Sequence, residues 1–149
     1  MDIIDRRIIG ELELDGRMST TLLASRVSLS VSATSERLRR LRESGLIKRF
    51  SVVVDHTMAG RTLEAIVDVL MPPTVDTAAT DAAIAALDPV INAVHVTGRY
   101  GLQLRVVARD VAELDQLLTT LHEEIGSEET NTTLVLRTVD GFPRSVKLS

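Results

Sequence analysis

The spacing of apolar residues changes once along this chain, and that change limits the possible folds more than any other feature. Up to about residue 45, apolar residues recur every three or four positions, as in amphipathic helices, with Ile4, Ile8 and Leu12 as the first stripe. Beyond residue 61 they alternate with polar residues over several short runs, as in half-buried strands. The sequence therefore predicts two domains, residues 1–60 and 61–149, joined through the segment 55–61.

Three short helices are predicted in the first domain. Asp2 is expected to cap the first helix, which Asp15-Gly16 ends with the glycine in the left-handed conformation. Ser19 opens a second helix through Arg26, and a third occupies 30–44. The three- or four-residue turn between these two is typical of a helix-turn-helix. The side chains expected to point inward are Ile4, Ile8, Ile9, Leu12, Leu22, Leu23, Val27, Val31, Thr34, Leu38 and Leu41.

Alternating residues predict strands from residue 48 onward. A connecting strand is expected over 48–54, and the second domain shows strands at 63–71, 90–97, 102–109 and 130–139. Helices are expected at about 76–87 and from Asp110 onward, and 140–149 form a polar tail. The inward residues of the later helix are Val111, Leu114, Leu117, Leu118 and Leu121.

The order of these elements after residue 61, β-α-β-β-α-β, is that of the ferredoxin-like fold. This α+β fold has an antiparallel sheet with both helices on one face. The opposite face carries Ile66 and Leu70 between Glu64 and Asp68, and a single chain leaves these apolar residues uncovered. A partner sheet is the natural cover, so we expect at least a homodimer.

Charge is unevenly distributed between the two domains. The net charge of −4 argues against nucleic acid as a partner, but residues 1–60 carry 10 Lys/Arg against 8 Asp/Glu, a net of +2. Residues 61–149 carry 7 against 13, a net of −6. Within 36–49 there are six basic and two acidic residues, so the sequence predicts a local anion contact there.

Several function classes find no support in the sequence. The chain has no Cys, and His56, His95 and His122 fall in a linker, a strand and a helix without metal-ligand spacing. No nucleophile motif, P-loop or dinucleotide fingerprint is present. No apolar run is long enough to span a bilayer, and the charged N-terminus lacks a signal-peptide core. We therefore expect a cytoplasmic protein that is not an enzyme and has no catalytic residue, cofactor, metal or membrane partner.

The chain resembles the Lrp/AsnC family, the leucine-responsive or feast/famine transcription regulators. The resemblance rests on Asp5-Arg6-Arg7-Ile8-Ile9, Asp15-Gly16-Arg17, Leu22-Leu23-Ala24, Leu29-Ser30-Val31-Ser32, Arg37-Leu38-Arg39-Arg40-Leu41, Ser44-Gly45-Leu46-Ile47-Lys48, Val96-Thr97-Gly98 and Thr132. It implies an N-terminal domain that reads double-stranded DNA and a C-terminal ACT-like domain that binds amino acids or similar metabolites. It also implies homodimers that can assemble into octamers.

The third predicted helix is the candidate DNA-reading element. Residues on the side away from its apolar stripe could enter the major groove, the first of them reaching base edges and the arginines reaching phosphate or guanine. Arg37 ranks below the other arginines, because it can pair instead with a carboxylate of the first helix. The alternative is a solvated, salt-bridged helix face. The candidate residues are Ser30, Ser32, Ala33, Ser35, Glu36, Arg37, Arg39 and Arg40.

The turn before the third strand of the second domain is the candidate effector site. Many family members carry acidic residues here, whereas this chain reads Gly98-Arg99-Tyr100-Gly101, which favours an anionic or neutral ligand. The alternatives are a plain hairpin turn, a clamp on nucleic-acid backbone, or a pocket that has lost its ligand. The candidate residues are Thr97, Gly98, Arg99, Tyr100, Gly101 and Gln103.

Two other functions fit the ferredoxin-like pattern. A small-molecule enzyme would need a deep pocket with convergent polar groups, and it would leave the helix-turn-helix unexplained. An RNA-binding module would need exposed aromatic residues on its strands, and the strands predicted after residue 61 contain none.

Overall fold

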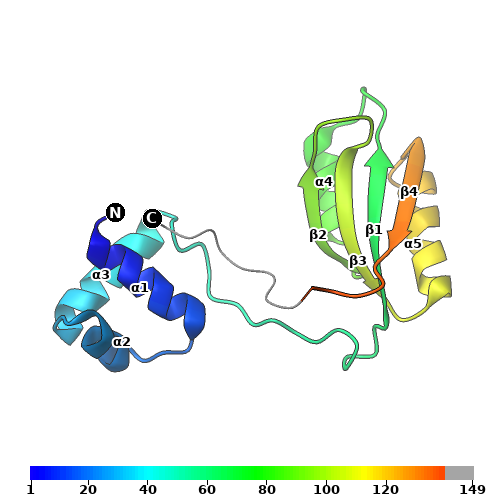
Figure 1. Ribbon diagram of the computed structural model, residues 1–149. Coiled ribbons are helices and arrows are strands. Elements are labelled where there is room, and N and C mark those ends of the chain that lie inside the picture. Colours follow the sequence, from blue (N-terminus) through cyan, green and yellow to red (C-terminus); the bar gives the residue numbers. More distant parts are fainter. Residues whose placement is uncertain (140–149) are drawn as a thin grey trace. The chain divides into compact units, whose positions relative to one another are not determined.

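The computed structural model describes residues 1–139, which form two compact units that divide between Val53 and Val54 (Figure 1). The first unit contains α1 (Ile3–Leu14), α2 (Thr20–Val27) and α3 (Val31–Glu43). The second contains β1 (Leu63–Leu70), α4 (Thr77–Ala85), β2 (Val90–His95), β3 (Gly101–Ala108), α5 (Val111–Glu123) and β4 (Glu129–Leu134). Over the described residues, no helix is long and apolar enough to cross a membrane.

Local side-chain caps begin all three helices of the first unit, and the sequence predicts those at Asp2 and Ser19. The Asp2 carboxylate accepts hydrogen bonds from the amides of Ile4 and Asp5, and the Asp5 carboxylate accepts one from the Asp2 amide. Ser19 and Ser30 cap α2 and α3 in the same way. The turn of residues 28–30 between α2 and α3 completes the helix-turn-helix.

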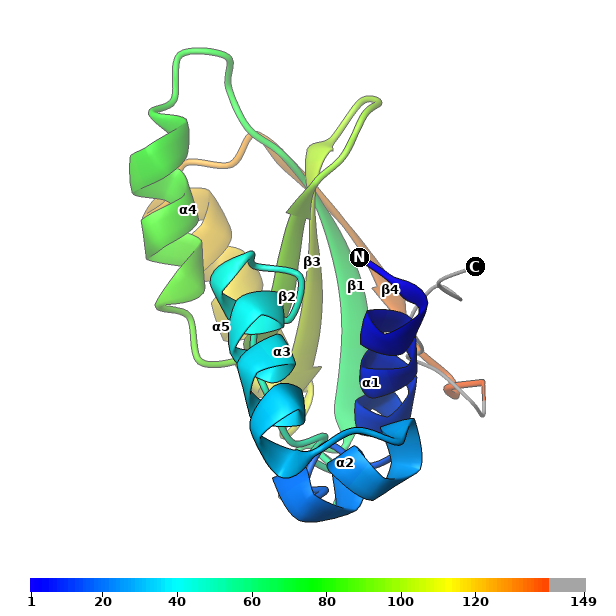
Figure 2. The same cartoon turned by 90° about the vertical axis from the view of Figure 1, so that its left-hand side faces the viewer.

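One apolar core holds these helices together. Ile8 of α1, Leu23 and Val27 of α2, and Leu41 of α3 are buried, and each helix contacts the other two (Figure 2). Thr34 is also fully buried, and its hydroxyl donates to the Ser30 carbonyl oxygen at 3.0 Å. A buried hydroxyl with a backbone partner carries no unsatisfied polar group, so threonine is tolerated in this core.

Three details of the predicted helices are wrong. Leu22 and Val31 are 45% and 46% exposed, because each lies in the first turn of its helix, where the neighbouring helices do not cover it. Gly16 is absent from the positive-φ residues; α1 ends instead with Asp15 in an extended conformation at φ −145°. An extended residue breaks the helical hydrogen-bond pattern as well as a left-handed glycine does.

The predicted connecting strand over 48–54 is also wrong for the single chain. These residues form neither helix nor strand, and Val52 and Val53 are 77% and 89% exposed. A strand forms only where a second backbone satisfies its amide and carbonyl groups. No strand of the described chain lies beside this segment.

The second unit is a four-stranded antiparallel sheet in the order β2-β3-β1-β4. Both helices lie on the same face of the sheet (Figure 1), which confirms the ferredoxin-like prediction. Strand β4 ends at Leu134 rather than at the predicted residue 139, because β1 begins at Leu63 and offers β4 little further backbone to pair with. The predicted polar tail, 140–149, lies outside the described residues.

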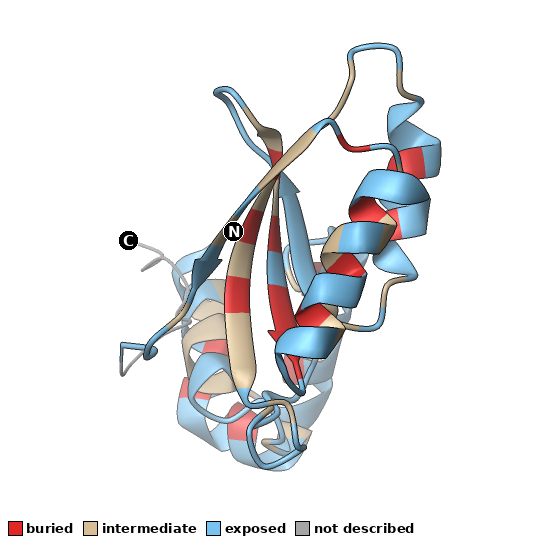
Figure 3. Ribbon diagram, turned by 90° about the vertical axis from the view of Figure 1, so that its right-hand side faces the viewer, coloured by how far each residue is buried: buried red, intermediate tan, exposed pale blue. Residues whose placement is uncertain are grey.

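The two faces of the sheet differ in character. On β1, the buried residues Ala65, Val67 and Val69 alternate with half-buried ones (Figure 3) and pack against α4 and α5. The helix residues in this core are Ile84, Leu114, Leu117 and Leu121. Val111 was predicted to join them but is 68% exposed at the first position of α5. On the open face, Asp68 accepts hydrogen bonds from the side chains of Gln103 and Asn131.

Candidate DNA-reading helix and effector pocket

The face of α3 opposite Thr34 and Leu41 is open to solvent. It exposes five of the predicted DNA-contact residues, namely Ser32, Ser35, Glu36, Arg39 and Arg40. Ser30 and Ala33 act at the start of the helix instead: the Ser30 hydroxyl oxygen accepts the Ala33 amide at 3.2 Å and lies 3.1 Å from the Ser32 hydroxyl. The predicted list therefore divides into an exposed face and a cap that orients it.

Arg37 joins α3 to α1. Its Nη1 atom lies 2.6 Å from Asp2 Oδ2 and 2.8 Å from Asp5 Oδ1, which is the structural pairing that the sequence offered as the alternative to DNA contact. The pKa of Asp2 is lowered, first by the hydrogen bond from the Asp5 amide and then by that from Arg37. Asp2 thus caps α1 and fixes α3 with one carboxylate.

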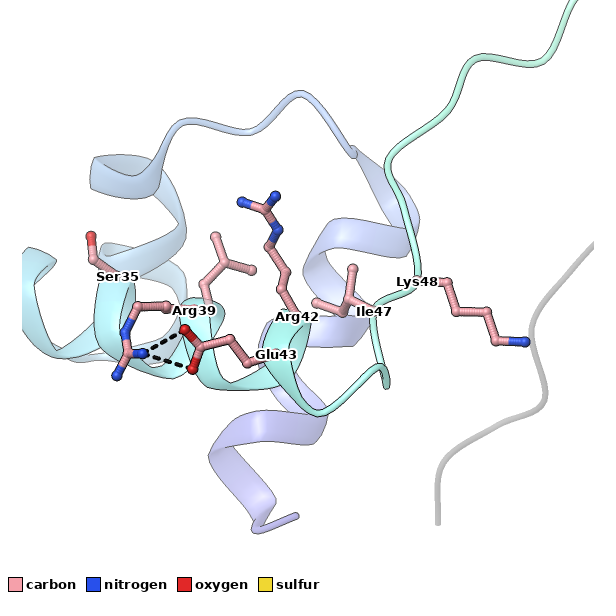
Figure 4. Close-up of a pocket in the computed structure, with 7 residues that line it drawn as sticks. Ser35, Arg39, Arg42, Glu43, Ile47 and Lys48 are labelled. Atoms are coloured by element: carbon pink, nitrogen blue, oxygen red, sulfur yellow. Dashed lines mark hydrogen bonds and ion pairs between the residues drawn. The ribbon is translucent and has the colours of Figure 1, made fainter.

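Arg39 lies between two carboxylates on its own helix. Its Nε and Nη2 atoms bind Glu36 at 3.0 and 2.5 Å, and its Nη1 atom binds both oxygens of Glu43 at 2.6 and 2.7 Å (Figure 4). These bonds, Glu36 first and Glu43 second, raise the pKa of Arg39, and the bond from Arg39 lowers the pKa of Glu36. The pairs are exposed, so each contributes little to stability in water.

A groove of about 540 Å³ runs beside Arg39, between the end of α3 and the turn that follows it. Figure 4 shows Arg42 and Lys48 extending away from the Arg39–Glu43 pair. Arg40, Arg42, Lys48 and Arg49 are exposed, and none forms an ion pair with a residue between 1 and 139. The last three were missing from the predicted list, although the basic run at 36–49 contains them.

The second unit holds a cavity of about 260 Å³ beside the turn between β2 and β3. Arg99, Tyr100 and Gly101 from the predicted effector residues line it. The other wall residues, which sequence reasoning missed, are mainly apolar: Leu70, Met71, Pro72, Pro73, Val75, Thr77, Thr80, His95 and Leu102. Five of these nine, Pro72, Pro73, Val75, Thr77 and Thr80, lie at or after the break that ends β1, in a segment whose position in the fold the sequence does not reveal.

A carboxylate absent from the turn itself reaches it from β4. Glu129 pairs with the Arg99 guanidinium and accepts the Tyr100 hydroxyl at 2.9 Å. The hydrogen bond to Glu129 is the main cause that raises the pKa of Tyr100. The strand register brings Glu129 close to the turn, because Leu70 of β1 pairs with Gly101 on one side and with Glu129 on the other. The turn itself carries no carboxylate, as its sequence shows, but the fold brings one to it from a distant strand.

The remaining predicted effector residues lie outside the cavity wall. Thr97 and Gly98 are exposed in the turn, where Gly98 and Gly101 have φ values of +114° and +72°, as tight turns require. Gln103 binds Asp68 on the open face of the sheet at 2.8 Å. Nowhere in residues 1–139 do three or more His, Asp or Glu side chains gather as metal ligands.

Known proteins share both parts of this arrangement. The family model of winged helix-turn-helix DNA-binding domains matches residues 1–48, and that of the Lrp/AsnC ligand binding domain matches residues 64–144. An HTH-type transcriptional regulator of Mycobacterium tuberculosis is 32% identical, over 96% of this chain and 97% of that protein. The regulatory protein AsnC of Haemophilus influenzae is 28% identical, over 87% of this chain and 89% of that protein.

A solved structure agrees over nearly the whole length. The feast or famine regulatory protein of M. tuberculosis, in complex with L-methionine, is 28% identical and superposes with a TM-score of 0.88, covering 97% of both chains. The helix-turn-helix, the four-stranded sheet and the relatives thus lead to one conclusion. This chain belongs to the Lrp/AsnC family of transcriptional regulators, with a DNA-binding module followed by a ligand-binding domain.

Proposed function

We propose that residues 1–60 bind specific double-stranded DNA through the exposed face of α3, and that residues 61–149 bind the effector and form the oligomer. The observation that carries this proposal is the asymmetry of α3. One face is locked into the core by Thr34 and Leu41, and the other presents Arg40 and Arg42 without a carboxylate partner among residues 1–139. Because the chromosome is the partner, we propose a cytoplasmic location; we propose no enzymatic role.

The position of each side chain on α3 suggests its part in binding. Ser32, Ser35 and Glu36 lie in the N-terminal half of the helix, the part that enters the major groove in helix-turn-helix proteins. Arg40 and Arg42 lie nearer the C-terminal end, and Arg42 lines one groove with Lys48; these cations can contact phosphates. Ser30 and Arg37 support the helix rather than touch DNA.

Removing two of these cations tests the DNA assignment. Operators selected from random duplex should be pseudo-palindromes with half-sites about 10 bp, or a multiple of that, apart. Arg40→Ala with Arg42→Ala should weaken operator binding and reduce the log–log salt slope by about two, one for each phosphate contact. Arg137→Ala, which removes an exposed cation from the second unit, is the control. Equal salt slopes for the double variant and the control would refute the assignment.

We propose a homodimer, and octamers built from it, on the basis of two uncovered surfaces. Residues 50–54 form neither helix nor strand in the single chain and expose Phe50, Val52, Val53 and Val54. The open face of the sheet leaves Ile66 and Leu70 half-buried in a single chain. A second copy would satisfy the backbone of the first surface and cover the apolar side chains of both.

Sedimentation of the full chain tests association. The parent protein should sediment as a dimer or a larger species at micromolar concentration. Val52→Asp with Val54→Asp should shift it toward smaller species, because charged side chains would be buried in the interface. Val111→Asp, at an exposed valine on α5, is the control. A parent protein that sediments as a monomer would contradict the proposal.

For the effector we propose a small amino acid or related carboxylate with an apolar side chain. Arg99 lines the cavity as a cation, and Leu70, Met71 and Leu102 form an apolar wall. Glu129 is not part of the wall, but its carboxylate contacts two residues that are, Arg99 and Tyr100. This combination suits a zwitterion better than the anion predicted from the turn alone. The L-methionine complex of the M. tuberculosis relative supports the same class. Occupied and empty cavities would favour different assemblies of the DNA-reading units and so change affinity.

Thermal-shift measurements with L-methionine and its 2-keto analogue test the effector class. L-Methionine should raise the unfolding temperature more than the keto acid, and Glu129→Gln should abolish the difference by removing the partner of the ammonium group. Glu128→Gln, at the exposed neighbouring position, is the control. A larger shift with the keto acid would favour the anionic ligand and contradict the zwitterion.

A further inference from the structure

The ion pairs around Arg39 occupy every nitrogen of its guanidinium group. Glu36 takes Nε and Nη2, and Glu43 takes Nη1, at distances between 2.5 and 3.0 Å. The three side chains together carry one net negative charge on the proposed DNA-reading face. Other cations of that face, Arg40 and Arg42, have no such partner within residues 1–139.

We infer that Glu36 and Glu43 are specificity-determining residues, which withhold Arg39 from non-specific DNA and release it to a matching base pair. This inference rests on the proposed role of α3. It names a function for two carboxylates that would otherwise only oppose binding to a polyanion. Glu36, Arg39 and Glu43 together form the Arg39 clamp.

The clamp weakens non-specific binding for an electrostatic reason. Non-specific affinity comes from cations that contact phosphates and release counterions. A guanidinium already neutralised by two carboxylates releases none, and the excess negative charge of the clamp repels phosphate. Random duplex therefore binds through Arg40, Arg42 and Lys48, without a contribution from Arg39.

A matching base pair carries no net charge, so the clamp does not repel it as it repels phosphate. The major-groove edge of guanine presents two acceptors, O6 and N7, in the geometry that a guanidinium binds with two hydrogen bonds. The side chains of the clamp are 53–59% exposed, and exposed ion pairs are worth little in water, so Arg39 can exchange its partners at low cost. Glu36, once released, can accept a hydrogen bond from the cytosine amino group.

The test compares two kinds of DNA across a range of salt concentrations. Glu43→Gln should raise affinity for random duplex about threefold or more near 0.1 M salt and steepen its salt slope by about one. Affinity for the selected operator should rise less, so the ratio of specific to non-specific affinity should fall. Adding Arg39→Ala to Glu43→Gln should return random-duplex binding toward that of the parent protein, because the released cation is gone.

Glu123→Gln is the matched control. Glu123 is an exposed carboxylate at the end of α5 that forms no ion pair with the described residues, and its substitution changes the net charge by the same amount. If Glu123→Gln has the same effect, or if Glu43→Gln strengthens operator and random duplex equally, the clamp does not determine specificity. If Glu43→Gln binds both DNAs as the parent protein does, the inference is also overturned. The proposed function would still stand in that case, provided that the parent protein binds the operator. Failure of the parent to bind any selected duplex would overturn both.

Discussion

Replacing Ile8 by alanine should strongly destabilise the helical unit and leave the sheet unit intact. Ile8 is fully buried in the core of α1, α2 and α3, and truncating a buried isoleucine to alanine costs about 2–5 kcal/mol. At about 0.05–0.15 kcal/mol per residue, a unit of 53 residues is stable by only about 3–8 kcal/mol. The substitution therefore removes a large part of the stability of this unit, and its unfolding temperature should fall by at least about 10 °C.

Calorimetry and DNA binding together check this prediction. The parent protein should show two transitions, and Ile8→Ala should lower one of them and weaken operator binding while the sheet unit still unfolds at its original temperature. Ile84→Ala is the mirror control, because Ile84 is equally buried but belongs to the core of the second unit. A single transition that both variants lower equally would show that the two cores unfold together, and the reasoning from separate units would be refuted.

Three further predictions follow from single contacts. The fold lowers the pKa of Asp2 below its unfolded value near 3.8, so the ionised carboxylate stabilises the protein above that pH, and this stability is lost as the pH falls through the folded pKa. Asp2→Asn should therefore reduce the dependence of the unfolding free energy on pH in the acid range, measured by urea unfolding. Ser19→Ala should cost about 1 kcal/mol in the same assay, since the Ser19 hydroxyl oxygen accepts the Leu22 amide at 3.2 Å. Tyr100 is the single tyrosine, so its absorbance reports its titration directly; Glu129→Gln should lower its pKa toward the ordinary 10.0, and an unchanged value would contradict the Glu129 contact.

The sequence by itself determined the local features of both units. The caps Asp2, Ser19, Ser30 and Asp110 each act on an amide two or three residues away, so chemistry within one turn fixes where the helices begin. The alternation along residues 63–70 likewise identifies the buried face of β1, because successive side chains of a strand point to opposite faces. These local patterns were enough to predict the element order and the helix-turn-helix.

The site and the exposed surfaces were decided by the tertiary structure. Arg37 meets Asp2 from 35 positions away, and Arg99 meets Glu129 from 30, through helix packing and strand register that no local pattern records. Residues 48–54 have strand-like alternation but no strand, because the partner backbone that a strand requires is absent from the described chain. Periodicity fixes which way a side chain faces, whereas its ion-pair and hydrogen-bond partners depend on which distant segments the packed core brings alongside it.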